Sequence, residues 1–206
     1  MCLLPVSLTA QTADLAPMLR SVETRYNHAQ TLQVLFHEAY TAPGQPRRAE
    51  GGTLLLRKPG RMRWDYTYPR TKLFVLDGKY AWFYAQGDQQ VQRLPAKQLD
   101  DLRSPLRFLL GHTQLEKELT HLTVAPVANG AYTLTGQLKD QEKRVPRLAL
   151  TVTPDGAITG IEIEEADGAI TRFAFTNQQI NAPAPAGAFH FTPPPGIPIV
   201  DAPPPV

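Results

Sequence analysis

The stretch LLLRKPGRMRWDYTYP, residues 54–69, alternates between apolar and charged residues on both sides of a Lys-Pro-Gly turn. Alternate side chains of a β-strand point to opposite faces, so this pattern predicts two strands with one apolar and one charged face. The apolar set is Leu54, Leu56, Met62, Trp64, Tyr66 and Tyr68; the other set is Leu55, Arg57, Arg61, Arg63, Asp65 and Thr67. One cation, Lys58, lies on the apolar side, where it must reach solvent or find hydrogen-bond partners.

Similar strand-like runs occur throughout the chain, and turn sequences rich in Gly, Pro, Asn and Asp separate them. The predicted strands are 31–41, 52–57, 62–68, 72–77, 80–86 and 91–94, then 121–127, 131–138, 147–153, 158–166 and 169–180. Asp77-Gly78 between two apolar runs is a strong hairpin signal. Neighbouring strands joined by short turns favour an antiparallel sheet.

Two regions have helical patterns instead. Leu15, Met18, Leu19, Val22 and Tyr26 recur at helical spacing, with Thr12 or Asp14 as the N-cap and an end near His28. The segment 96–119 is rich in leucine and contains a Ser104-Pro105 start signal and a Gly111 stop signal, which predict two or three short helices. We therefore expect a mainly β, strongly curved sheet or barrel in one domain, residues 12–200, with a proline-rich tail at 201–206.

The N-terminus leaves two interpretations open. Residues 3–8 are apolar and are followed by small residues typical of a signal-peptide cleavage site, but the basic region that opens such a peptide is missing. Residues 1–11 are thus either the remnant of a secretory signal or a disordered apolar end. No apolar run reaches the roughly 18 residues that a membrane span needs.

Composition and motifs exclude several classes of function. The 206 residues are 42% hydrophobic and 19% charged, and the net charge of +2 comes from dispersed basic residues, so we expect no nucleic-acid partner. The single cysteine, Cys2, allows no internal disulfide. The five histidines lack metal-ligand spacing, and we find no phosphate loop and no catalytic constellation. We therefore expect no metal, no cofactor and no enzymatic activity.

The apolar face has two possible uses. It can be an ordinary packed core, which is the commoner use of apolar stripes. It can also line a pocket for an apolar ligand, covered by the short helices of the middle segment, which bury little area and could detach at low cost.

Four quoted features together resemble the LolA-type periplasmic lipoprotein carrier family. They are GGTLLLRKPGRMRWDYTYP, then KLFVLDGKYAWFYAQGDQQV, then SPLRFLLG, and finally FHFTPPPG. The resemblance extends from the first predicted helix to Gly196 and is carried by the order of these features. It implies an unclosed half-barrel whose helices form a lid over an apolar cavity.

The resemblance also implies roles for individual residues. The cavity would be lined by Leu54, Leu56, Met62, Trp64, Tyr66, Phe74 and Trp82, and the lid would contain Leu102, Leu106, Leu109 and Leu110. Lys58 would act as the lid latch. The family has an arginine directly before the proline, and Lys58 replaces it here. The lid would then be held closed by the compact ammonium of a lysine instead of the planar guanidinium of an arginine, which can donate two parallel hydrogen bonds.

By the same resemblance, the protein would be a periplasmic monomer that binds lipoprotein acyl chains. Its partners would be an inner-membrane lipoprotein-releasing transporter and an outer-membrane acceptor. Two alternatives remain open at this point: a carrier of another lipid or apolar molecule, and a non-catalytic envelope regulatory or interaction domain of the same fold.

Overall fold

A computed structural model describes residues 15–97, 109 and 114–201. The helices described over their whole length are α1 (Leu15–His28), α4 (Leu115–Glu118) and the 3-10 turn η1 (Ala128–Gly130). The first strands are β1 (Thr31–Thr41), β2 (Arg48–Arg57), β3 (Arg61–Tyr68), β4 (Lys72–Leu76), β5 (Tyr80–Ala85) and β6 (Val91–Pro95). The later strands are β7 (Leu119–Pro126), β8 (Tyr132–Leu138), β9 (Arg147–Val152), β10 (Ile158–Glu164), β11 (Ile170–Ile180) and β12 (Ile199–Asp201).

Every strand predicted from the sequence is present, with boundaries shifted by a few residues. Strand β12 was not predicted, because its Ile-Val pair lies in a proline-dense stretch that shows no alternating pattern. The possible N-caps Thr12 and Asp14, the segment 1–11 and the last residues, 202–206, lie outside the described residues. Within the described part of the chain, no helix is long and apolar enough to cross a membrane.

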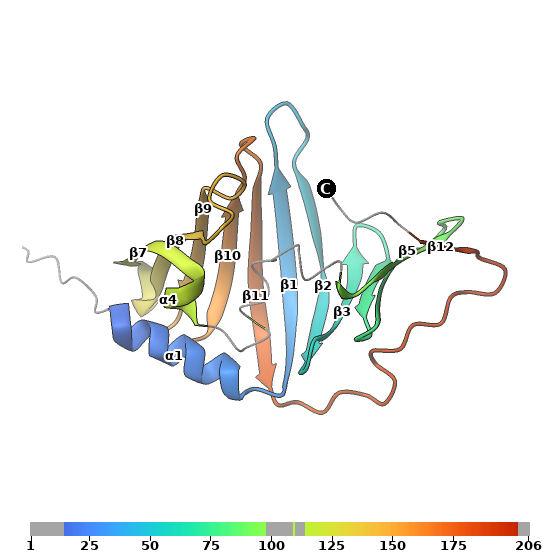
Figure 1. The fold of residues 1–206 in the computed structure, drawn as a ribbon, viewed down its shortest axis with the longest axis horizontal. Helices are drawn as coiled ribbons and strands as arrows, with labels where there is room; N and C mark the ends of the chain where they lie inside the picture. Colours follow the sequence, from blue (N-terminus) through green and yellow to red (C-terminus); the bar gives the residue numbers. More distant parts are fainter. Residues whose placement is uncertain (1–14, 98–108, 110–113, 202–206) are drawn as a thin grey trace, which may run out of the picture.

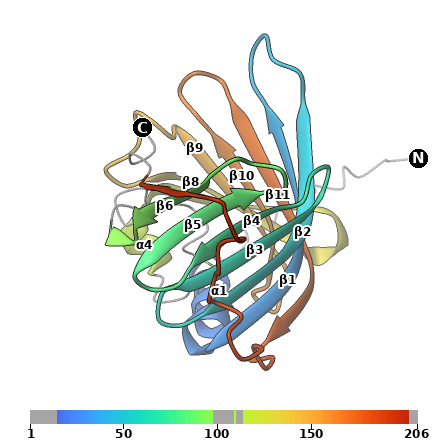
Figure 2. The ribbon, with the colours of Figure 1, turned by 90° about the vertical axis from the view of Figure 1, so that its right-hand side faces the viewer.

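All the strands belong to one sheet in the order β12-β6-β5-β4-β3-β2-β1-β11-β10-β9-β8-β7. Neighbours are antiparallel except for β12, which runs parallel to β6. The sheet is strongly curved, and its edge strands β12 and β7 do not pair with each other (Figures 1 and 2). The predicted unclosed, curved antiparallel sheet is therefore confirmed.

The strand register carries the predicted alternation across the sheet in continuous rows. In one row Val34 of β1 lies opposite Leu54 of β2, Leu54 lies opposite Trp64 of β3, and Trp64 lies opposite Phe74 of β4. Because paired residues project to the same face, this row keeps its apolar side chains on the concave side. The concave face therefore holds the main core cluster, which includes the apolar stripe of α1.

The C-terminal segment between β11 and β12 packs against the opposite, convex face. Phe189 is 4% exposed, and the guanidinium of Arg57 lies 4.7 Å from the centre of its ring. Arg63 donates a hydrogen bond of 3.0 Å from Nη1 to the carbonyl of Ala188. Figure 2 shows this segment crossing the outer side of β3 to β5. Part of the charged face predicted from the sequence is thus used to hold the chain's own C-terminal segment.

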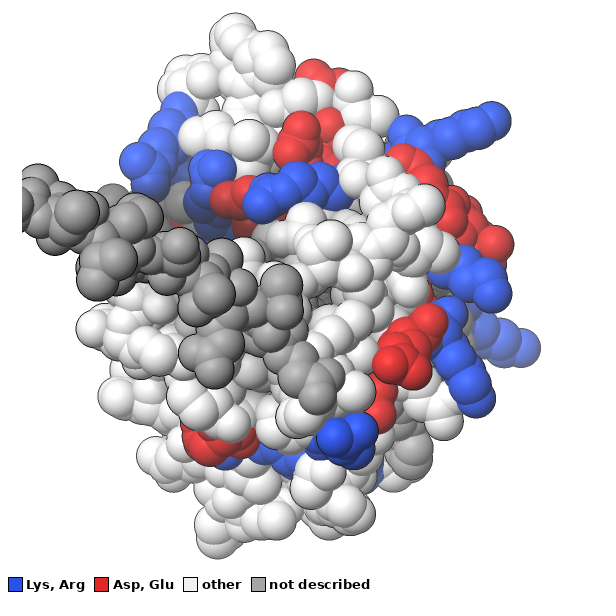
Figure 3. Space-filling model, turned by 90° about the vertical axis from the view of Figure 1, so that its left-hand side faces the viewer, with Lys and Arg blue, Asp and Glu red and all other residues white. Residues whose placement is uncertain are grey.

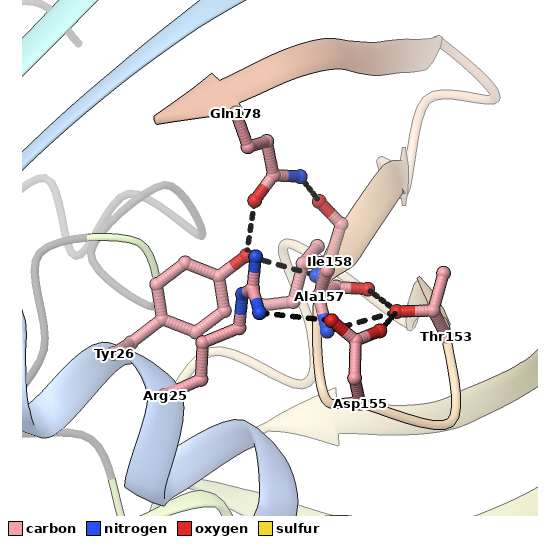
Figure 4. A network of polar contacts seen from close by, with 7 residues as sticks. All are labelled: Arg25, Tyr26, Thr153, Asp155, Ala157, Ile158 and Gln178. Carbon is pink, nitrogen blue, oxygen red and sulfur yellow. Dashed lines mark hydrogen bonds and ion pairs between the residues drawn. The ribbon is translucent and has the colours of Figure 1, made fainter. Parts of the chain in front are cut away.

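Helix α1 crosses the lower end of the sheet and is fixed to the β9–β10 hairpin (Figure 1). The hydroxyl of Tyr26 accepts a hydrogen bond of 2.8 Å from the backbone N–H of Ile158 and donates one of 3.0 Å to Oε1 of Gln178. Gln178 in turn donates to the carbonyl of Ile158 at 2.7 Å, which closes the ring of contacts seen in Figure 4. Burial of the Tyr26 hydroxyl raises its pKa, so this group stays protonated and able to donate.

Close backbone packing holds the same helix in place. Gly156, in the β9–β10 hairpin, has φ +81°, and a Cβ built there would lie 2.5 Å from the backbone of Ser21. Only glycine permits both this conformation and this approach. Beside it, Arg25 of α1 forms a 2.9 Å ion pair with Asp155 of the hairpin (Figure 4).

Candidate functional site

The concave face has two zones that differ in burial. We call the first the covered zone: it contains the predicted lining residues that are at most 9% exposed, namely Leu54, Leu56, Met62 and Trp64. All of them belong to the core cluster that also contains Met18, Leu19, Val22 and Tyr26 of α1. These residues point to the concave side as the alternation predicts, and in this state they pack as core.

We call the second zone the aromatic wall: it consists of Tyr66, Phe74, Leu76 and Phe83, from strands β3, β4 and β5. All are partly buried, and the Phe74 and Phe83 ring centres lie 4.7 Å apart. Tyr66 connects the two zones, because its ring packs edge-to-face on Phe36 at 5.0 Å and stacks on Trp64 at 5.9 Å. The wall is thus an apolar surface that the described residues cover only in part.

The prediction that Trp82 lines the concave face is wrong. Trp82 lies opposite Val75, and Val75 lies opposite Arg63, which places the indole on the convex face. There Nε1 donates to Asp77 at 2.8 Å, and the ring packs 5.7 Å from Phe191.

The aromatic residue of β5 that does face the wall is Phe83, directly opposite Phe74. Sequence reasoning missed Phe83 because the run YAWFYA offers aromatic residues on both faces, so composition alone does not fix which set points inward. The signal that could have identified it is the Asp77-Gly78 hairpin, which sets the register between β4 and β5.

Lys58 follows β2 and points to the C-terminus of α1. Its Nζ donates hydrogen bonds of 2.8 Å to the carbonyl of Tyr26 and 2.7 Å to that of Asn27. These carbonyls belong to the last turn of the helix, where no backbone N–H within the helix can satisfy them and where a positive charge is favoured. Partial desolvation lowers the pKa of the Lys58 ammonium. The partners seen for Lys58 are thus in α1, and its predicted contact with the lid stays a prediction.

Of the predicted lid leucines, Leu102, Leu106 and Leu110 lie outside the described residues. Leu109 is described and is 3% exposed, within the core cluster. It shares with Lys58, Leu32 and Leu56 a small cleft of about 10 Å³. That volume is close to the minimum for one water molecule, so this part of the concave face is closely packed.

Polar side chains stand at the end of the concave face next to the aromatic wall. Burial, reinforced by the nearby charge of Glu50, raises the pKa of Glu38 in β1. Burial and the charge of Glu38 also raise the pKa of Tyr66. Lys72 of β4 forms a 2.5 Å ion pair with Glu50 of β2. The wall therefore has one apolar region and one charged end.

The chemistry available at this face is that of apolar contact with polar groups at one end. Within the described residues no group of three His, Cys, Asp or Glu side chains could hold a metal ion. On the side of the molecule seen in Figure 3, acidic and basic side chains are interspersed and form no large patch of one sign. A partly covered aromatic surface suits a flexible apolar ligand such as an acyl chain.

Residues 27–192 match the family model described as outer membrane lipoprotein carrier protein LolA. The chain belongs to the LolA family. Among curated relatives, the outer-membrane lipoprotein carrier protein of Chromobacterium violaceum is 30% identical over 172 residues, 84% of this chain and 82% of the relative. That of Nitrosomonas europaea is 27% identical over 202 residues, 97% of this chain and 93% of the relative.

Solved structures agree with the LolA-like fold. An uncharacterized conserved protein from Thermus thermophilus superposes with a TM-score of 0.58 at 13% identity, covering 91% of this chain and 98% of that one. The lipoprotein LppX from Mycobacterium tuberculosis superposes with a TM-score of 0.54 at 12% identity, covering 84% of this chain and 99% of that one. At these identities the likeness shows the fold alone.

Proposed function

We propose that this LolA-family protein is a periplasmic, monomeric carrier that holds the acyl chains of lipoproteins and transfers them from the inner to the outer membrane. The observation that carries the proposal is the aromatic wall, an apolar concave surface only partly covered, in a chain whose curated relatives are named lipoprotein carriers. The donor would be an inner-membrane lipoprotein-releasing transporter and the recipient an outer-membrane acceptor. The protein would not act as an enzyme.

The physical basis is transfer of methylene groups out of water. Each buried CH₂ contributes about 0.8 kcal/mol, so free acyl chains do not cross an aqueous compartment unshielded. A carrier must also release its cargo. Cover over the binding face lowers the net affinity, because ligand binding must first displace it. Leu102, Leu106, Leu109 and Leu110 are our proposed cover, and Leu54, Leu56, Met62 and Trp64 would join the aromatic wall as lining once that cover moves.

Two consecutive residues of β5 test the proposal. Phe83 faces the wall, whereas Tyr84 lies on the convex side against Phe191. We expect Phe83→Asp to weaken binding of a fluorescent diacylated lipopeptide by about tenfold or more, because a carboxylate would replace apolar contact. Tyr84→Asp is the matched control and should change the affinity by less than about twofold.

Equal affinities of the two variants, with native circular dichroism spectra, would rule out the wall as the binding face. Trp64→Asp is a poorer test, because Trp64 is 3% exposed and its loss would disturb the core. Native mass spectrometry of protein purified from its own periplasm would separate lipoprotein cargo from another lipid. A protein that carries no lipid there would support the alternative of an interaction domain.

A further inference from the structure

Four titratable side chains from four neighbouring strands meet at the charged end of the aromatic wall. We call them the rim cluster: Glu38 of β1, Glu50 of β2, Tyr66 of β3 and Lys72 of β4. Glu38 lies directly opposite Glu50, and Tyr66 lies directly opposite Lys72. The strands that carry them lie side by side in the sheet (Figure 1). The cluster therefore occupies two adjacent levels at this end of the concave face, because Tyr66 and Lys72 lie level with Gly52, two residues along β2 from Glu50.

A glycine allows Tyr66 of the rim cluster to contact Phe36 on the concave face. Gly52 lies opposite both Phe36 and Tyr66, and a Cβ there would lie 1.9 Å from the carbonyl oxygen of Asp65. Because Gly52 has no side chain, the ring of Tyr66 reaches across β2 to Phe36, at 5.0 Å. Tyr66 is thus both the last ring of the apolar surface and a member of the rim cluster.

The positive charge in the rim cluster is not shared equally between its carboxylates. Lys72 Nζ lies 2.5 Å from Glu50 Oε2 and 4.1 Å from the centre of the Tyr66 ring. Arg48, two residues from Glu50 along β2, places its guanidinium 4.4 Å from the ring centre of Tyr40. The charges of Lys72 and Arg48 both favour an ionised Glu38, yet burial and Glu50 outweigh them and leave its pKa raised.

A purely structural ion pair would not need this arrangement. Like charges directly opposite each other on neighbouring strands destabilise a sheet, and Glu50 with Lys72 alone would already tie β2 to β4. The second carboxylate adds acceptor oxygens in a partly desolvated place, beside the surface that would hold acyl chains. A ligand cation placed there would relieve the repulsion and gain charge-assisted hydrogen bonds.

We propose that Glu38 and Glu50 form the polar end of the cargo site and bind a primary ammonium group at the head of an acylated ligand. Lys72 would orient Glu50, and Tyr66 would position Glu38. This inference rests on the proposed carrier function. The ammonium could be the free α-amino group of a diacylated lipoprotein or the amine of an ethanolamine phospholipid, and the chemistry of recognition is the same.

The test compares probes that differ only at the nitrogen. One pair is a dipalmitoyl-glyceryl-cysteine peptide with a free amino terminus and its N-acetylated form. The other pair is dihexanoyl phosphatidylethanolamine below its micelle concentration and its N-acetylated form. We expect the wild-type protein to bind the free amine of at least one pair about tenfold more tightly than the acetylated form. The pair that shows the preference identifies the source of the ammonium.

The variant Glu38→Gln/Glu50→Gln should reduce this preference, the ratio of the affinities for the amine and the acetylated probe, to about twofold or less. Glu164→Gln, in β10 and outside the cluster, is the matched control and should keep the full preference. Equal affinities for amine and amide in the wild type would overturn the ammonium site while the carrier function stands. A preference that survives in the double variant would overturn it as well. If no acylated probe binds at all, the carrier function fails and the site fails with it.

Discussion

The covered zone and the aromatic wall are parts of one sheet with one alternation pattern, but they differ in what holds their cover in place. Over the covered zone, α1 is fixed by the buried hydroxyl of Tyr26, by close contact with Gly156 and by the ammonium of Lys58. Over the wall, the described residues leave the rings of Phe74 and Phe83 partly exposed. The difference shows that apolar alternation sets which way side chains point, whereas specific polar and backbone contacts decide which part of the face stays closed.

The largest expected loss of stability comes from separating α1 from the β9–β10 hairpin. In Gly156→Ala the new Cβ would meet the backbone of Ser21 at 2.5 Å, which cannot move without moving the helix. We expect a loss of about 2–5 kcal/mol, the sum of the positive-φ cost and overpacking. Urea unfolding measures it.

Gly87→Ala is the control for the first of these two costs. Gly87 has φ +91° and no heavy atom within 4 Å of a built Cβ, so it reports the backbone cost without a clash. We expect it to lose only about 1–2 kcal/mol. Equal losses in the two variants would show that contact with α1 contributes nothing, and the comparison between the zones would lose its main support.

Replacement of Lys58 is expected to cause a smaller loss of stability. Lys58→Met removes two hydrogen bonds of 2.8 and 2.7 Å to the last carbonyls of α1 together with a favourable charge at the helix end. We expect a loss of about 1–3 kcal/mol and faster hydrogen exchange in the last turn of the helix. Lys58→Arg keeps the charge and the donors and should retain most of the stability. Unchanged exchange in Lys58→Met would mean that α1 does not depend on this contact.

The sequence predicted the sheet and the orientation of most concave residues, because periodicity and turn residues encode them locally. Leu54, Leu56, Met62 and Trp64 point as their alternation requires. Trp82 was assigned to the wrong face and Phe83 was missed because, in a strand with aromatics on both sides, only register distinguishes them. The contact of Lys58 with α1 joins residues 32 and 31 positions apart, and no local pattern predicts it.

The rim cluster illustrates the same limit. Glu38 and Glu50 lie 12 positions apart, and Lys72 lies a further 22 positions along the chain, so their meeting depends on the pairing of four strands. The strands themselves were predicted, but no local pattern distinguishes these charged residues from others. Charged side chains near strand ends are common on solvated edges, and only burial separates this cluster from them.

The smallest expected effect is a pH dependence of the unfolding free energy that comes from Glu38, at the charged end of the wall. Because the pKa of Glu38 is raised in the folded state, the native protein binds more protons than the unfolded chain as the pH rises above the ordinary glutamate value. The contribution of Glu38 to stability is therefore fully present below that value and is lost as the pH rises through its folded pKa. Glu38→Gln stays uncharged and should show a flatter dependence of the unfolding free energy on pH, with a stability above that of the wild type at neutral pH.

The difference between wild type and Glu38→Gln, measured by urea unfolding from acidic to neutral pH, reports on Glu38 and the groups coupled to it, because titrations elsewhere in the chain cancel. Glu164→Gln provides the baseline, since that residue lies outside the rim cluster. If the difference curve for Glu38→Gln runs parallel to the baseline, Glu38 is fully compensated by Lys72 and Arg48, and the wall has no unsatisfied charge at its end. If it falls with rising pH, the two zones differ in charge as well as in cover: the Tyr26 hydroxyl and the Lys58 ammonium at α1 are hydrogen-bonded within the chain, and the end of the wall keeps one carboxyl whose charge a ligand could match.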